Sequence, residues 1–173
     1  MIVVIDLGSQ TAHLISRRIR DLGVESELFS RKITAKELKN KNLKGIILSG
    51  GPDATYKQGS MTIDKKILEL GVPVLGICYG MQLMARLLGG KVILGSQKEF
   101  GGVIVKIKPH LLFTGLASEQ SAWMSHTDQV KTLPQGFKDF GSTKITPNVA
   151  MFDDKRKLFG IQYHPEVAHT VEG

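Results

Sequence analysis

Short apolar runs alternate with helical segments through the first ninety residues of this chain. The runs have the length and composition of buried strands, and they lie at residues 2–5, 24–29, 45–48 and 72–77. The segments between them carry apolar residues at helical spacing, and the predicted helices cover residues 9–22, 35–40, 61–70 and 81–88. In the first helix, Ser9 is the predicted N-cap and Gly23 the stop. This order predicts βαβ units, and therefore an α/β fold with an open, mostly parallel twisted sheet and helices on both faces, of the flavodoxin-like kind.

The second half of the chain follows a different pattern. Strand-like runs come with few helices between them, at residues 92–94, 103–107, 122–125, 149–152 and 158–162. Residues 153–155 predict a hairpin turn between the last two runs. No linker, repeat or low-complexity segment interrupts the sequence. We therefore expect a single domain over residues 1–173, with extra antiparallel strands in its C-terminal half.

Composition narrows the classes of protein that the chain can belong to. The one cysteine excludes an intramolecular disulfide and, with no basic leader at the N-terminus, predicts a cytoplasmic location. No apolar run approaches the ~18 residues of a membrane helix. Lys+Arg number 23 and Asp+Glu 16, and part of this excess lies in residues 31–44. No aromatic side chains interleave that basic stretch, so we expect neither a nucleic-acid nor a membrane partner.

The segment Gly76-Ile77-Cys78-Tyr79-Gly80 lies where the fourth strand is expected to pass into a helix. Glycines on both sides of a nucleophile at such a junction are typical of a nucleophile elbow. The amides at the start of the helix favour a thiolate on Cys78. The alternative is a buried structural cysteine, which is the commoner fate of a lone cysteine.

His164 directly follows the last predicted strand, in the string Gln162-Tyr163-His164-Pro165-Glu166. A thiolate nucleophile needs a base that takes and returns a proton, and Glu166 can accept the other ring N–H of that base. Cys78, His164 and Glu166 are therefore the predicted catalytic triad. From this short string alone, a surface histidine that pairs with Glu166 by accident is an equal alternative.

Glycines also follow the third predicted strand, in Ser49-Gly50-Gly51-Pro52. Backbone N–H groups of this loop, together with the amide of Tyr79, could form an oxyanion hole, and a plain tight turn is the alternative. The string also resembles the start of a pyrophosphate-binding signature, but Ala54 stands in place of a serine and Pro52 has no N–H. We therefore expect no ATP site in this loop. The scattered histidines and the lone cysteine predict no metal site.

Three motifs in order carry a family resemblance: Ser-Gly-Gly-Pro at residues 49–52, Gly-Ile-Cys-Tyr-Gly-Met-Gln at 76–82, and His-Pro-Glu at 164–166. Over about residues 1–172 the chain resembles the class I (triad) glutamine amidotransferases. Residues 6–10, 123–128 and 164–170 are similar to the branch of that family that forms the glutaminase part of GMP synthetases.

The resemblance implies hydrolysis of glutamine to glutamate and ammonia through a γ-glutamyl thioester on Cys78. His164 would act as general base and acid, and Glu166 would orient it. The oxyanion donors would be the amides of Gly51 and Tyr79. The resemblance also assigns substrate binding to five further positions: Gly50, Gln82, Ser125, His126 and Thr127. Residues 125–128 match a loop of the family that holds the amino-acid end of glutamine, and Asp128 would face a partner. Thr127 departs from the family, which often has glycine there.

The resemblance also implies a partner. Because the chain lacks an ATP pyrophosphatase domain, it resembles the separate-subunit form found in archaea. The partner would be an ATP pyrophosphatase (synthetase) subunit that adenylates xanthosine monophosphate with Mg-ATP and accepts the ammonia, while this chain itself would need no cofactor.

Other functions stay open at this point. The chain could serve as an amidotransferase for another acceptor. A cysteine-dependent hydrolase of the same architecture would keep the elbow but would not need Gln82 or His-Pro-Glu. A non-catalytic binding module is the third alternative, and the complete set of Cys78, His164 and Glu166 argues against it.

Overall fold

A nine-stranded sheet runs through the whole molecule in the computed structural model, which describes residues 1–173. The strands are β1 Ile2–Asp6, β2 Ser26–Ser30, β3 Gly45–Leu48, β4 Val74–Ile77, β5 Lys91–Ile107, β6 Glu119–Thr132, β7 Lys138–Ser142, β8 Ala150–Asp153 and β9 Leu158–Ile161. The α-helices are α1 Ala12–Asp21, α2 Ala35–Lys39 and α3 Tyr79–Leu87. Two short 3-10 helices complete the set, η1 Lys65–Glu69 and η2 Leu111–Phe113.

The strand order is β2-β1-β3-β4-β9-β8-β7-β5-β6. The pairs from β2 to β9 are parallel, and the pairs from β9 to β6 are antiparallel. The predicted α/β fold is therefore confirmed: a parallel core carries antiparallel strands contributed by the C-terminal half. The hairpin predicted around residues 153–155 is present between β8 and β9.

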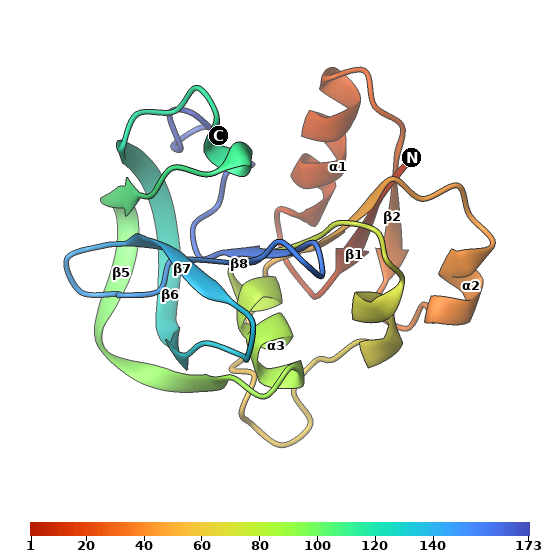
Figure 1. Cartoon of the computed structure of the whole chain (residues 1–173), viewed down its shortest axis with the longest axis horizontal. Helices are drawn as coiled ribbons and strands as arrows, with labels where there is room; N and C mark the ends of the chain where they lie inside the picture. The colour runs from red at the N-terminus through yellow and green to blue at the C-terminus, as the bar shows by residue number, and fades with distance from the viewer.

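Helices cover both faces of the parallel part. Alternate side chains of β1 point to opposite faces, as the strand period of two requires. Val3 and Ile5 belong to a core shared with α2, η1 and α3, whereas Val4 belongs to a second core that includes Ile15 of α1. Figure 1 shows α1 on one side of the sheet and α3 on the other. The antiparallel strands extend the second core, because Val105 of β5 and Met124 of β6 are buried there.

Two predicted helices differ from the structure. The first begins at Ala12 and not at residue 9, because the Ser9 hydroxyl is already used in the preceding turn, where it accepts a hydrogen bond from the Thr11 amide. Ser9 is therefore not the N-cap, and Thr11 occupies that position without a side-chain cap. The helix predicted over residues 61–70 is only the five-residue 3-10 helix η1. Its N-cap, Asp64, also accepts a hydrogen bond from Ala35 at the start of α2.

The antiparallel half is longer and more regular than predicted. The runs at 92–94 and 103–107 are parts of one strand, β5, which pairs with β6 along most of its length. These two strands form the tall curved ribbon at the left of Figure 1. Strand β7 was not predicted, and residues 125–128, expected as a loop, lie within β6. The loop expectation is wrong because these residues pair with β5.

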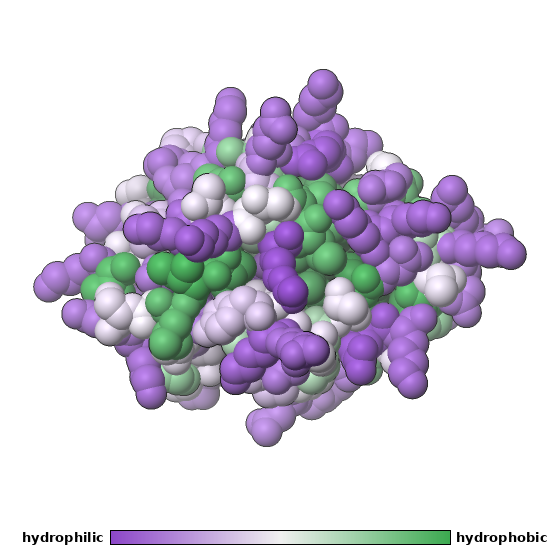
Figure 2. Space-filling model, turned by 90° about the horizontal axis from the view of Figure 1, so that it is seen from below, coloured by the Kyte–Doolittle hydropathy of each residue, from purple (hydrophilic) through white to green (hydrophobic).

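The outside of the molecule is mainly polar. Figure 2 shows the face seen from below in Figure 1, where hydrophilic side chains surround smaller apolar areas. Leu94 and Phe100 of β5 are among the exposed large apolar side chains. None of the helices combines the length and the apolar character that crossing a bilayer requires.

Candidate active site

Cys78 occupies a sharp turn between β4 and α3. Its backbone has φ 51° and ψ −108°, a conformation that residues with a side chain rarely adopt. A Cβ atom at Gly76 would lie 2.6 Å from the backbone of Gly80, and one at Gly80 would overlap the carbonyl oxygen of Leu48. Both glycines are therefore required by close backbone approach. This segment has the geometry of a nucleophile elbow: a strand passes into a helix, the backbone of Cys78 is strained, and the flanking glycines pack tightly.

Strand register brings three separate segments together at this turn. Leu48 of β3 lies opposite Gly76 of β4, and Ile77 lies opposite Ile161 of β9. The amide of Cys78 donates to the carbonyl oxygen of Ile161 at 2.8 Å. Because parallel strands end at the same edge, the residues after β3, β4 and β9 converge there. The glycine loop, Cys78 and the His164 segment are those residues.

His164 and Glu166 form a buried pair. The Nδ1 of His164 lies 2.8 Å from Oε1 of Glu166, and the two side chains are 12% and 2% exposed. The same carboxylate oxygen accepts a hydrogen bond from the hydroxyl of Thr11 at 2.7 Å. A carboxylate that accepts from Nδ1–H leaves Nε2 of the ring free to exchange a proton.

His164 lies close to Cys78. A Cβ atom built on Gly50 would be 3.1 Å from Cε1 of His164 and 3.8 Å from Cβ of Cys78, so Gly50 fits into the gap where the two side chains meet. Burial, the largest influence, lowers the pKa of His164, but the sulfur of Cys78 and the carboxylate of Glu166 together raise the pKa to about 10. Burial raises the pKa of Glu166, and His164 and Thr11 outweigh this and lower it. The arrangement favours an imidazolium at His164, between Sγ of Cys78 and the carboxylate of Glu166.

Ser49 anchors the glycine loop, residues 49–52, through two hydrogen bonds. Its buried hydroxyl accepts a hydrogen bond from the amide of Leu7 and donates to the carbonyl oxygen of Gly50. A Cβ atom at Gly51 would lie 3.2 Å from the ring of Tyr79, which places these two residues side by side. Neither the amide of Gly51 nor that of Tyr79 donates a hydrogen bond within the chain. Both amides are therefore available to a ligand beside Cys78.

Two buried glutamines form a chain of hydrogen bonds that ends at the sulfur. The side-chain amide of Gln162 donates to Sγ of Cys78 at 3.4 Å. The oxygen of Gln162 accepts from Nε2 of Gln82 at 3.0 Å, and Nε2 of Gln82 also donates to the carbonyl oxygen of Asp128 at 2.9 Å. Because both protons of the Gln82 amide are used, its oxygen is the atom left to accept from a ligand.

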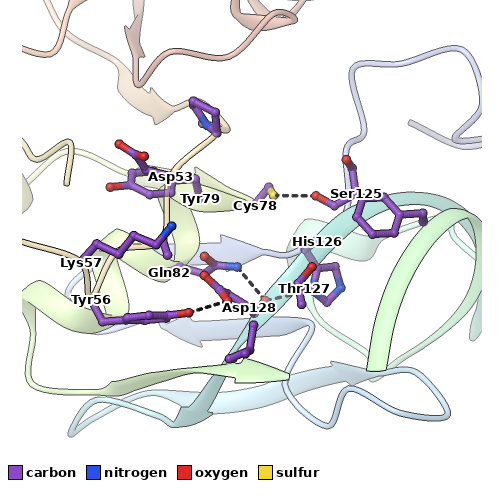
Figure 3. Close-up of a pocket in the computed structure, with 15 residues that line it drawn as sticks. Asp53, Tyr56, Lys57, Cys78, Tyr79, Gln82, Ser125, His126, Thr127 and Asp128 are labelled. Atoms are coloured by element: carbon purple, nitrogen blue, oxygen red, sulfur yellow. Dashed lines mark hydrogen bonds between the residues drawn. The ribbon is translucent and has the colours of Figure 1, made fainter. Parts of the chain in front are cut away.

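A cavity of about 600 Å³ opens over Cys78. Residues 125–128 of β6 form one wall, and Tyr56 reaches the wall through a hydrogen bond from its hydroxyl to the carboxylate of Asp128 at 3.0 Å. Figure 3 shows the sulfur of Cys78 facing the carbonyl group of Ser125, at 3.9 Å. A second cavity, of about 480 Å³, lies on the side of Gln10, Trp123 and His164, and Cys78 lines both.

His126 belongs to this wall and lines the cavity, although it is almost fully buried. Its Nδ1 lies 2.9 Å from the carbonyl oxygen of Asp128, and its Nε2 lies 3.2 Å from the carboxylate of Glu99. Burial lowers the pKa of His126, against the opposing effects of Asp128 and Glu99. Of the residues predicted to bind substrate, Gly50 lies beside Cys78, and the others line the cavity: Gln82, Ser125, His126 and Thr127.

Sequence reasoning missed four residues of this site: Thr11, Ser49, Glu99 and Gln162. Ser49 and Gln162 had a signal, since they immediately follow β3 and β9 at the edge where sites form. No group of three or more histidine, cysteine, aspartate or glutamate side chains has the arrangement of a metal site. The polar groups around Cys78 are suited to bind a small polar molecule with an amide or carboxyl group.

Comparison with known proteins decides the family. The model of the class I glutamine amidotransferase family matches residues 3–173. The chain belongs to this family. Among curated relatives, the GMP synthases [glutamine-hydrolyzing] of Staphylococcus carnosus and Staphylococcus aureus are 53% and 51% identical to this amidotransferase over all 173 residues. The chain spans 34% of the length of these relatives.

Solved structures agree with this assignment. A putative GMP synthase subunit from Thermoplasma acidophilum has a TM-score of 0.85 and 31% identity, with 98% of this chain and 86% of that chain covered. A glutamine amidotransferase from Thermotoga maritima has a TM-score of 0.76 at 21% identity, with 96% and 76% covered, and it shares the fold. The amidotransferase described here is thus homologous to the amidotransferase region of GMP synthases. The separate-subunit form of its synthetase partner stays a prediction.

Proposed function

We propose that this amidotransferase hydrolyses glutamine and supplies the ammonia to an ATP pyrophosphatase-type synthetase that converts xanthosine monophosphate to GMP with Mg-ATP. The observation that carries the proposal is that Cys78, His164 and Glu166 lie together at the β4–α3 turn. The amides of Gly51 and Tyr79 lie next to them and donate no hydrogen bond within the chain. Support for the acceptor comes from the names and the 51–53% identity of the GMP synthase relatives.

The cavity suits a glutamine side chain aimed at the sulfur. A volume of about 600 Å³ is ample for one amino acid, and polar groups surround it. The oxygen of Gln82 would accept from the α-amino group, and the β6 wall from Ser125 to Thr127 would hold the amino-acid end. Asp128, at the far end of that wall, would face the synthetase.

The chemistry would proceed in two halves. In the resting site Nε2 of His164 already holds the proton of the thiol, so Sγ of Cys78 attacks the side-chain amide carbon as a thiolate, and the amides of Gly51 and Tyr79 stabilise the negative oxygen. The C–N bond then breaks, His164 gives its proton to the departing nitrogen, and ammonia and the γ-glutamyl thioester form. His164 next takes a proton from water, which attacks the thioester. Glutamate leaves, and His164 keeps the proton beside the sulfur, which restores the resting site.

Side chains around the site would hold the reacting groups in place through these steps. Glu166 holds Nδ1 of His164, so that Nε2 faces the sulfur, and Thr11 holds Glu166. Gln162 donates to the sulfur and would stabilise its negative charge. Ammonia must reach the acceptor before it is protonated in bulk water, so the synthetase is expected to cover the site during transfer.

Replacement of the nucleophile tests the proposal directly. In the complex with its synthetase, Cys78→Ala is expected to abolish GMP formation from glutamine and to leave GMP formation from ammonium salts intact, because only the thioester step needs the sulfur. His164→Asn should behave in the same way, and His13→Asn, on the exposed side of α1, should behave as wild type.

GMP formation is followed with xanthosine monophosphate and Mg-ATP, and glutamate release is measured in parallel. Glutamine use that persists in Cys78→Ala would contradict the proposed chemistry. Glutamate release without any amination of xanthosine monophosphate would contradict the proposed acceptor only.

A further inference from the structure

The segment that begins at His164 is bonded to the outer edge of β6, the last strand of the sheet. The amide of His164 donates to the carbonyl oxygen of Trp123 at 3.0 Å. Farther along, the amide of Val171 donates to the carbonyl oxygen of Ser121 at 3.2 Å. Figure 1 shows the C-terminal end of the chain near the upper end of β6. Because an edge strand has unpaired N–H and C=O groups, residues 164–171 can bond to its backbone directly.

Thr170 completes the backbone contact between these two segments. Its hydroxyl accepts a hydrogen bond from the amide of Trp123 at 3.0 Å and donates one to the carbonyl oxygen of His164 at 2.5 Å. Both backbone groups of His164 are therefore held to Trp123, the amide directly and the carbonyl group through the hydroxyl. The Thr170 residue is only 8% exposed, so its hydroxyl is largely shielded from water.

Trp123 joins this contact to the cavity wall. Its ring packs on the ring of His169, with centroids 4.5 Å apart, so the side chain also holds the C-terminal segment. Ser125, two positions farther along β6, has the carbonyl group that faces the sulfur of Cys78. The strand that forms the wall of the cavity therefore also anchors the backbone of His164.

The bond from Glu166 to the His164 ring does not by itself place that ring. Glu166 is two residues away on the same segment, so the two side chains could shift together relative to Cys78. Contacts with other elements prevent such a shift: Thr11 holds the carboxylate of Glu166, and Thr170 holds the backbone of His164 to β6. A displacement of about 1 Å can lower the rate of a reaction by about a hundredfold.

We propose that Thr170 is a positioning residue, whose hydroxyl fixes the backbone of His164 to β6 and so keeps the imidazole ring beside the sulfur of Cys78. For its effect on glutamine hydrolysis, the inference rests on the proposed function. Thr170 does not line the cavity over Cys78. Its loss should therefore lower kcat and leave the Michaelis constant KM for glutamine nearly unchanged.

Two substitutions separate the hydroxyl from the rest of the side chain. Thr170→Val keeps the shape but leaves the amide of Trp123 and the carbonyl group of His164 without this partner. Thr170→Ser keeps the hydroxyl and loses only a methyl group. The serine variant should therefore retain what the valine variant loses. Thr170→Ala, which lacks the hydroxyl without adding apolar bulk, is the second variant should Thr170→Val fail to fold.

Ser16→Ala is the matched control for the loss of a buried hydroxyl. Ser16 is 2% exposed, and its hydroxyl bonds to Ser26 and Arg20, not to the His164 segment. This substitution should lower stability without displacing the base. Thermal melts establish that each variant is folded at the temperature of the assay.

Kinetics of glutamine hydrolysis in the complex with the synthetase give the first test. Thr170→Val is expected to lower kcat by about 10–100-fold and to change KM by less than about threefold. Thr170→Ser and Ser16→Ala should keep kcat within about threefold of the wild type. A folded Thr170→Val protein with the wild-type kcat would overturn the inference. So would a Thr170→Ser protein that behaves as Thr170→Val, or an equal loss in Ser16→Ala.

Alkylation of Cys78 by iodoacetamide at neutral pH gives a second test, which needs no glutamine. The positive His164 ring beside the sulfur favours the reactive thiolate, so a displaced ring should slow the reaction by about tenfold in Thr170→Val. Thr170→Ser and Ser16→Ala should react at the wild-type rate. An unchanged rate in a folded Thr170→Val protein would overturn the inference. If even the wild type failed to hydrolyse glutamine, the proposed function would be contradicted, and this measurement alone would decide the role of Thr170.

Discussion

At the scale of single residues, the sulfur of Cys78 is surrounded by groups from three separate segments, after β3, after β9 and within β6. Gly50 lies beside both Cys78 and the His164 ring, Gln162 donates to the sulfur, and Ser125 lies across the cavity. Each neighbour matches the proposed chemistry, in which a base needs access to the sulfur, a thiolate needs a hydrogen-bond donor, and a substrate needs space. The strained backbone of Cys78 costs on the order of 1–3 kcal/mol, which the surrounding packing must offset.

Gln162 is expected to control the reactivity of that sulfur. Gln162→Leu removes the only side-chain amide that donates to Sγ, and a hydrogen bond to a charged group contributes about 1.5–3 kcal/mol, so alkylation of Cys78 by iodoacetamide should slow by about 10–100-fold. The rate is measured at neutral pH by mass spectrometry. Gln120→Leu makes the same change at an exposed position near the start of β6 and should leave the rate unaltered. A folded Gln162→Leu protein that alkylates at the wild-type rate would disprove the role.

Motifs made Cys78, His164 and Glu166 visible in the sequence, because an elbow and a His-x-Glu string are local patterns. Their catalytic roles stay predictions, whereas their convergence is an observation. Thr11 and Glu99 had no such signal, since their partners Glu166 and His126 are distant along the chain. Contacts of this kind exist only once the sheet has formed, and no local rule predicts them.

At the scale of elements, the β4–α3 turn determines where the site lies. Gly76 and Gly80 let the turn fold back on itself, and α3 then begins directly after Cys78. The parallel strands were predictable because buried strands are short, continuous apolar runs. Strand β7 was not, because Lys138, Asp139 and Gly141 form no apolar pattern and the strand exists through its pairing with β8. The helix predicted at 61–70 failed because Asp64 ties the start of η1 to α2.

Gly80→Ala tests the packing of the elbow. The new methyl group would overlap the backbone of Leu48, which cannot move without disturbing β3, so the free energy of unfolding should fall by about 3 kcal/mol. Glutamine hydrolysis should be lost with it. Gly102→Ala places the same methyl group in β5 with its nearest neighbour 4.0 Å away, and it should cost less than about 0.5 kcal/mol. Denaturant unfolding measures both, and equal losses would contradict this account of the elbow.

At the scale of the whole molecule, the sheet brings together residues that are far apart in the sequence. Gln162 and Cys78 are 84 positions apart in the sequence, and the whole antiparallel half lies between β4 and β9 in the chain. Because that half returns to pair β9 with β4, His164 and Cys78 end at the same edge. The long β5–β6 ribbon then places the wall of the cavity opposite α3. One fold thus brings together the turn at Cys78, the His164 ring and the cavity wall of β6.

The most direct test of the central claim is the covalent labelling of the intact protein by a glutamine analogue that carries an alkylating group at the side-chain position. After digestion, mass spectrometry locates the label. The account predicts a label on Cys78 alone, slowed by excess glutamine, reduced strongly in His164→Asn and absent from Cys78→Ala. A label on any other residue, or one that persists in Cys78→Ala, would contradict it.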